Sequence, residues 1–145
     1  MKTNAIRIHE FGGPEVLRYE EVELSEPAEN EARIRHTAIG LNFIDTYNRT
    51  GLYPMELPTG LGSEAAGIVE AVGADVSEVS VGDRVVYTGR LPADAYSERR
   101  NFAASQLVLL PDGVSDEQAA AVFLKGMTSW YLLRRSYAVQ SGDSI

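Results

Sequence analysis

Residues with reactive or hydrogen-bonding side chains are concentrated in one short stretch of the first third of the chain. Within six positions it holds an amide, a carboxyl, a hydroxyl and a phenol: Asn42-Phe43-Ile44-Asp45-Thr46-Tyr47. Asparagine favours the position just before a helix, and an acid three residues later suits the helix dipole and can hydrogen-bond back to the cap. Asn42 and Asp45 therefore predict the start of a short helix, and capping and ligand binding explain them equally well.

Further candidate groups follow in an irregular segment and in the last quarter of the chain. The phenol of Tyr53, placed among prolines, either faces a pocket or covers the core with its hydroxyl in water. Thr128 and Tyr131 are one helical turn apart and share a helix face. The alternative is that Met127, Trp130 and Tyr131, at helical spacing, are simply core residues.

The composition excludes several other kinds of chemistry. The 145 residues include no cysteine, which removes disulfides, thiolate nucleophiles and every thiolate-containing zinc site. His9 and His36 lie on predicted strands without a ligand-spaced partner or a nucleophile motif, so neither a metal site nor a Ser-His-Asp triad is expected.

Charge and hydropathy narrow the choice of partner and location. The chain carries 13 Lys and Arg against 21 Asp and Glu, a net charge of −8, which disfavours nucleic acid and anionic membrane surfaces as partners. The sequence has neither the pattern of a signal peptide nor an apolar run of roughly 20 residues. A cytoplasmic protein is therefore expected.

The elements that must position these groups are predicted to be short strands followed by helix. Residues 32–38 alternate between apolar and polar side chains, a period of two that indicates a half-buried strand. Many short strands favour a barrel or a sandwich. The others are expected at 3–11, 16–22, 64–72, 84–88, 95–100 and 106–110, bounded by glycine, proline or polar turns.

The last quarter of the sequence changes to a helical period. Ser115 and Gln118 have the spacing of a capping box, which predicts a helix beginning just after Ser115. Gly126 interrupts the apolar face that follows, and we expect it to divide the region into two helices.

Glycines are dense between Gly60 and Gly73 and recur at Gly82. They do not form the G-x-G-x-x-G spacing of a phosphate loop between a strand and a helix. Strand boundaries and close backbone contacts explain them better than contact with a ligand.

These glycines nevertheless carry a family resemblance. Gly62-x-Glu64-x-x-Gly67-x-Val69, with Gly73 and Gly82-Asp83-Arg84-Val85, resembles the hallmark of the N-terminal GroES-like domain of the medium-chain dehydrogenase/reductase superfamily. Three further motifs resemble its zinc-free, zeta-crystallin-like quinone oxidoreductase branch, bacterial NADPH:quinone oxidoreductases in particular: residues 42–47, Gly51-Leu52-Tyr53-Pro54 and Leu124-Lys125-Gly126-Met127-Thr128.

The resemblance implies a mainly β fold with helices, in the α+β class. Residues 1–125 would form a partly open GroES-like β-barrel, the catalytic domain. Residues 126–145 would form a connecting helix and the start of a nucleotide-binding Rossmann domain that lies outside the chain.

The resemblance also implies roles for individual residues. Tyr47 and Tyr53 would be catalytic and line the quinone pocket. The residues implied to bind NADPH are Asn42, Phe43, Ile44, Asp45, Thr46, Tyr47, Thr128 and Tyr131. Zinc-dependent relatives carry a Cys at about the position of Asn42 and a His directly before the motif glutamate, where this sequence has Ser63, so no metal is expected.

The function implied is hydride transfer from NADPH to a small-molecule quinone by the complete enzyme, a homodimer, with the 145-residue chain inactive by itself. A zinc-free enone or enoyl reductase of the same superfamily, in which a tyrosine supplies the proton, is one alternative. A non-catalytic GroES-like binding module is another.

Overall fold

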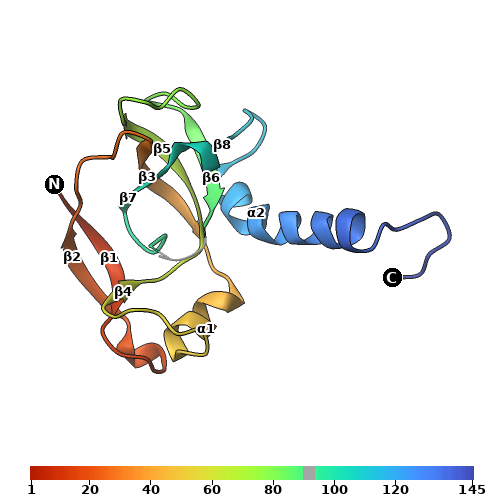
Figure 1. Cartoon of the computed structure of the whole chain (residues 1–145), viewed down its shortest axis with the longest axis horizontal. Coiled ribbons are helices and arrows are strands. Elements are labelled where there is room, and N and C mark those ends of the chain that lie inside the picture. Colours follow the sequence, from red (N-terminus) through yellow and green to blue (C-terminus); the bar gives the residue numbers. More distant parts are fainter. Residues whose placement is uncertain (90–93) are drawn as a thin grey trace.

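The computed structural model describes residues 1–89 and 94–145, which form two antiparallel sheets and two α-helices (Figure 1). The smaller sheet has the order β2-β1-β4, with strands β1 (Lys2–Ile8), β2 (Arg18–Glu23) and β4 (Thr59–Gly60). The larger has the order β7-β3-β5-β6-β8, with strands β3 (Glu31–Gly40), β5 (Glu64–Val72), β6 (Arg84–Thr88), β7 (Arg99–Ala103) and β8 (Val108–Leu109). The mainly β, α+β fold predicted from the sequence is confirmed.

The centre of the larger sheet is the pair β3 and β5. Ile34 of β3 lies opposite Val69 of β5, and both side chains are buried. Tyr87 of β6 packs against Phe102 of β7 with ring centroids 4.3 Å apart. One apolar cluster therefore holds these four strands together: Ala32, Ile34, Ala65, Val69, Val79, Val85, Tyr87, Ala95, Phe102 and Ala104.

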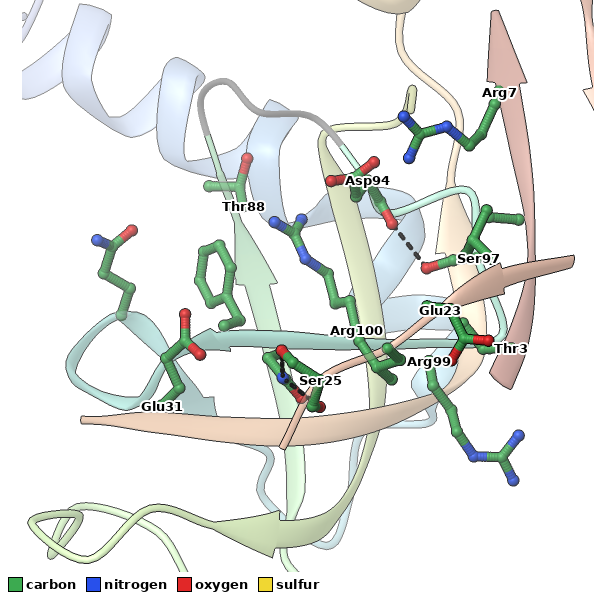
Figure 2. A pocket seen from close by; sticks show the side chains of 16 residues that line it. Thr3, Arg7, Glu23, Ser25, Glu31, Thr88, Asp94, Ser97, Arg99 and Arg100 are labelled. Atoms are coloured by element: carbon green, nitrogen blue, oxygen red, sulfur yellow. Dashed lines mark hydrogen bonds between the residues drawn. The ribbon is translucent and has the colours of Figure 1, made fainter. Parts of the chain in front are cut away.

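The two sheets form only a partly open barrel. Among the described residues, an isolated β-bridge between Ala5 and Ser97 links β1 to the segment before β7. β2 and β7 are edge strands of their sheets. A cavity of about 650 Å³ lies among residues of β1, β2 and β7 (Figure 2). Arg100 extends into it, and burial raises the pKa of Asp94 on its wall, although Arg100 and Arg7 oppose the shift. None of the side chains selected from the sequence lines this cavity.

Two helices follow strands of the larger sheet. α1 (Phe43–Thr50) comes soon after β3 and ends at Gly51, whose φ of 79° is the left-handed conformation that glycine adopts readily. α2 (Asp116–Tyr131) begins at the predicted capping box. The Gln118 N–H donates to Ser115 Oγ at 3.2 Å, and the Ser115 N–H donates to Gln118 Oε1 at 3.0 Å. The first turns of α2 pack on the larger sheet, and the rest projects away from it (Figure 1).

α2 differs from the prediction in two respects. It runs without a break through Gly126, so the predicted division into two helices is wrong. A Cβ at Gly126 would meet nothing within 4 Å, so packing does not break the helix there. The second difference is that Met127, Trp130 and Tyr131 are exposed and do not belong to the core. The domain boundary predicted after residue 125 falls inside this helix and stays a prediction.

Several predicted strands are shorter or shifted. The strand expected at 95–100 is observed as β7, because the residues before it turn locally: Ser97 Oγ donates to the Asp94 carbonyl at 2.7 Å. The strand expected at 106–110 is reduced to β8 after the 3-10 turn η2 (Ala104–Gln106). A second such turn, η1 (Pro14–Val16), precedes β2, and the π-helical turn η3 (Leu132–Ser136) follows α2. Across residues 1–89 and 94–145, no helix is long and apolar enough to span a membrane.

Candidate active site

The polar stretch predicted to start a helix does so. Asn42 is the N-cap of α1, and Asp45 Oδ2 accepts a hydrogen bond from the Asn42 N–H at 3.0 Å. The acid therefore satisfies one of the backbone donors that a helix start leaves free. The Asn42 side chain bonds away from the helix, to Glu64 and Lys125.

Asp45 is the centre of a buried polar cluster. Its side chain is almost fully buried, and its carboxylate accepts from Ser63 Oγ at 2.7 Å and from the Tyr96 hydroxyl at 2.9 Å, besides Asn42. Burial, aided by the hydrogen bond and charge of Asp45, raises the pKa of Tyr96, which keeps this phenol a donor. Asp45 thus faces inward and fixes the start of α1 against the sheets.

Tyr96 is part of this cluster, although the residues around it in the sequence did not indicate a role. Its partner in space is Gly62, which has a φ of 92° and whose Cβ, if present, would collide with the Tyr96 ring. Glycine at this motif position therefore makes room for the residue that bonds Asp45.

Glu64, the glutamate of the glycine motif, joins α1 to α2. It is fully buried at the start of β5. Its Oε1 accepts from the Leu124 N–H at 2.5 Å, and its Oε2 accepts from Asn42 Nδ2 at 2.8 Å. Because Gly40 has no side chain, β3 can approach closely here: a Cβ would strike the Ala120 carbonyl and Glu64. Within the glycine-rich segment, Glu64 thus has a structural role: it connects the start of α1 to α2.

Three aromatic rings, two on α1 and one in the segment after it, form an exposed row. Phe43 meets Tyr47 edge-on with centroids 5.5 Å apart, and Tyr47 meets Tyr53 at 5.8 Å and 86°. Their exposed fractions are 76%, 37% and 49%, in that order. An exposed aromatic row is suited to contact with a planar ligand.

The remaining predicted site residues are less tightly grouped. Ile44 is exposed, and Thr46 bonds its hydroxyl to the Phe43 carbonyl of its own helix. Thr128 donates to the Leu124 carbonyl at 2.8 Å, and Tyr131, the last residue of α2, is exposed. The structure brings residues 42–47 and Tyr53 together, whereas Thr128 and Tyr131 follow on a neighbouring helix.

The two positions where zinc-dependent relatives carry ligands do meet in space. Asn42 contacts Glu64 and Asp45, and Ser63 bonds Asp45, so both belong to one buried corner. An amide and a hydroxyl are not the side chains that hold zinc in such sites. In the part of the chain that the structure describes, no group of three or more His, Cys, Asp and Glu side chains is arranged to hold a metal ion.

Comparisons with known proteins cover most of the chain. A model of the alcohol dehydrogenase GroES-like domain matches residues 28–129. A quinone oxidoreductase of Pseudomonas aeruginosa is 56% identical over 142 residues, which are 97% of this chain and 43% of that protein. A 2-haloacrylate reductase of a Burkholderia species is 42% identical over 144 residues, 95% of this chain and 43% of that protein.

A solved structure gives the same picture. Escherichia coli quinone oxidoreductase complexed with NADPH matches with a TM-score of 0.91 at 51% identity, covering 94% of this chain and 42% of that one. The chain thus spans less than half the length of the relatives it matches.

Proposed function

The chain belongs to the alcohol dehydrogenase GroES-like domain family, and on that basis we propose that it is the catalytic-domain portion of an NADPH:quinone oxidoreductase that works without metal. The observation that supports this most is the 51% identity and TM-score of 0.91 to the NADPH-complexed relative. The match to the family model, over residues 28–129, includes the Asn42 turn and the α2 motif, which a simple binding module would not need. A cytoplasmic homodimer remains the prediction for the complete protein.

The residues at the start of α1 fit a nicotinamide cofactor. The Phe43–Tyr47–Tyr53 row offers an exposed aromatic surface, and Asn42 is held rigidly beside it by Glu64. We assign residues 42–47 to the cofactor side, with Asp45 acting through the position of the helix, and Thr128 and Tyr131 to the same side from α2. When bound, NADPH supplies the hydride.

The protein's own contribution is orientation and charge stabilisation. Once a quinone accepts hydride, one of its oxygens becomes a phenolate and takes a proton to complete the hydroquinone. Tyr47 or Tyr53 can donate a hydrogen bond to that oxygen as its charge develops, and both phenols are partly exposed.

A second candidate function is reduction of an activated carbon–carbon double bond. The 2-haloacrylate reductase at 42% identity supports it, since the same tyrosines would then face an enolate. Turnover of p-benzoquinone against 2-chloroacrylate by the complete protein separates the two functions.

The test is NADPH oxidation measured by absorbance, with the complete protein and with this chain alone. We expect saturable, quinone-dependent turnover by the complete protein, unaffected by chelators, and no zinc by elemental analysis. The chain alone should be inactive because the turn at 42–47 cannot replace a pyrophosphate-binding domain. Stoichiometric zinc, or turnover by the chain alone, would disprove the corresponding part of the proposal.

Tyr53 gives the sharpest test of the aromatic row. In the complete protein, Tyr53→Phe should lower kcat/KM for quinone by about 10-fold, since one hydrogen bond to a developing charge is lost. Tyr53→Ala should do more harm because it also ends the edge-on contact with Tyr47. Tyr19→Phe, which removes an exposed hydroxyl bonded to Glu98, is the matched control and should change nothing. Unchanged quinone kinetics in Tyr53→Ala would remove Tyr53 from the site.

A further inference from the structure

We propose that Lys125 is a positioning residue for this reaction, one that fixes the orientation of the Asn42 amide. The inference rests on the proposed function and deepens it. Lys125 lies on α2, one turn before Thr128, and its ammonium reaches back to the start of α1, where Nζ lies 2.8 Å from Asn42 Oδ1.

The hydrogen-bonding capacities of the two neighbours allow only one amide orientation. An ammonium group can only donate, and a carboxylate can only accept. Lys125 Nζ therefore requires the amide oxygen of Asn42 on its side, and Glu64 Oε2, 2.8 Å from Nδ2, requires the amide nitrogen on the other. A flipped Asn42 amide would break both hydrogen bonds at once, inside a site where the side chain is only 6% exposed.

Lys125 is exposed, yet its ammonium group has partners in the buried corner. Its side chain is 54% exposed, and an exposed lysine normally retains its rotamer freedom. Here its Nζ also lies 3.4 Å from the Leu41 carbonyl and 3.7 Å from Glu64 Oε2. Three oxygens of the same corner converge on one ammonium, so the lysine bridges α2 to the turn that carries Asn42.

The consequence for the reaction is geometric. Asn42 begins the helix that presents the aromatic row, and Lys125 sits on the helix that presents Thr128. Loss of the bridge would leave Glu64 alone to hold the amide and would let the two surfaces shift relative to each other. Misplacement of about 1 Å at a reacting centre can cost on the order of 100-fold in rate, so a clear kinetic effect is expected from a side chain that touches neither reactant.

The test compares Lys125→Met with Lys125→Gln. Methionine keeps the apolar stem and removes the donor, whereas glutamine keeps an N–H donor and removes the charge. Lys2→Met, the same change at the other lysine of the chain, is the control, since Lys2 pairs with Glu21 on the surface. In the complete protein we expect Lys125→Met to lower kcat/KM for NADPH about 10-fold, Lys125→Gln to restore it to within about 3-fold, and Lys2→Met to match the wild type.

A second readout, on the isotope-labelled 145-residue chain, is independent of turnover. The side-chain amide protons of Asn42 should exchange faster and shift in the NMR spectrum of Lys125→Met, but not of Lys125→Gln or Lys2→Met. Unchanged Asn42 resonances, wild-type kinetics in Lys125→Met, or a Lys125→Gln variant as slow as Lys125→Met would each overturn the proposal while the proposed function stands. A complete wild-type protein that reduces neither quinone nor haloacrylate would overturn the proposed function and this role together.

Discussion

Two groups of polar side chains in this fold, one buried and one partly buried, are satisfied in different ways. At the corner of α1, β5 and α2, the carboxylates of Asp45 and Glu64 are surrounded by donors from hydroxyl, amide and backbone groups. In the middle of the larger sheet, His36 and Tyr87 bond each other, with Tyr87 Oη and His36 Nε2 2.8 Å apart. In the corner, carboxylate oxygens accept hydrogen bonds from several donors. In the sheet, two neutral side chains bond to each other.

The sheet pair is held neutral by its surroundings. His36 Nδ1 lies 2.6 Å from the Ser97 carbonyl, which can only accept, so Nδ1 carries the proton and Nε2 accepts from the Tyr87 hydroxyl. Burial lowers the pKa of His36 to about 4 and raises that of Tyr87 to about 12. The corner therefore differs from the sheet pair in the number of hydrogen-bond donors that surround its carboxylates.

This difference also separates the proposed functional surface from the scaffold. The corner borders exposed side chains and links three elements, whereas the pair lies within one sheet. The most disruptive way to test the comparison is to remove an acceptor from the corner.

Glu64→Leu should lower the free energy of unfolding of the chain by about 3 kcal/mol. Leucine removes the acceptor of the buried Asn42 amide, at about 1 to 3 kcal/mol, and of the partly buried Leu124 N–H, at less, and the helix recovers part of that loss by relaxing. Denaturant unfolding measures the change. Glu70→Leu, which removes the partly exposed partner of Arg35 and Arg99, is the control and should cost under about 1 kcal/mol. Equal losses in the two variants would contradict the special status of the corner.

Much of this corner could be predicted locally, but its assembly could not. The N-cap at Asn42 and the capping box at Ser115 depend on neighbouring residues, and both are confirmed. The meeting of Asp45 with Ser63 and Tyr96 depends on pairings across the chain that no local pattern encodes. Family resemblance placed Asn42 and Ser63 at related positions, yet it gave no role to Lys125 or Tyr96.

The strand predictions show the same limit. Residues 32–38 alternate between apolar and polar side chains and lie in β3, and the strands expected at 64–72 and 84–88 are β5 and β6. Edge strands were less predictable: β4 has two residues, and β7 begins four residues later than expected, because the turn at Asp94 and Ser97 takes the first part of that segment. Short edge strands depend on their neighbours more than on their own sequence.

The pH dependence of the free energy of unfolding tests the neutral pair, His36 and Tyr87. The unfolded chain protonates His36 near the ordinary histidine pKa of 6.5, and the folded chain does so only near 4, so the unfolded state binds more protons between these values. Stability is therefore fully present above pH 6.5 and is lost as the pH falls toward 4, by about 2 kcal/mol after allowance for partial exposure of the ring.

Denaturant unfolding at several pH values measures this loss. His36→Gln keeps a donor and an acceptor but cannot titrate, so its unfolding free energy should lack this component. Asp116, whose pKa is lowered by Thr37 and Arg84, titrates mainly below pH 3.8, which lies under most of the His36 range. Equal pH profiles for the wild type and His36→Gln would show that the sheet pair is not responsible.

The smallest expected change in stability is at Gly126, the first residue of α2 after those that contact Glu64. Glu64 binds Leu124 and Lys125, and the next residue is Gly126, inside a continuous helix with open space around its Cα. Gly126→Ala should therefore stabilise the chain by about 0.5 to 1 kcal/mol, because alanine restricts the unfolded chain and has the higher helix propensity. Thermal or denaturant unfolding of the chain gives the value. Gly40→Ala is the contrasting control: it should destabilise strongly, because its Cβ would strike the Ala120 carbonyl and Glu64. A destabilising Gly126→Ala would mean that the glycine does interrupt the helix in solution, as its place in the sequence first indicated.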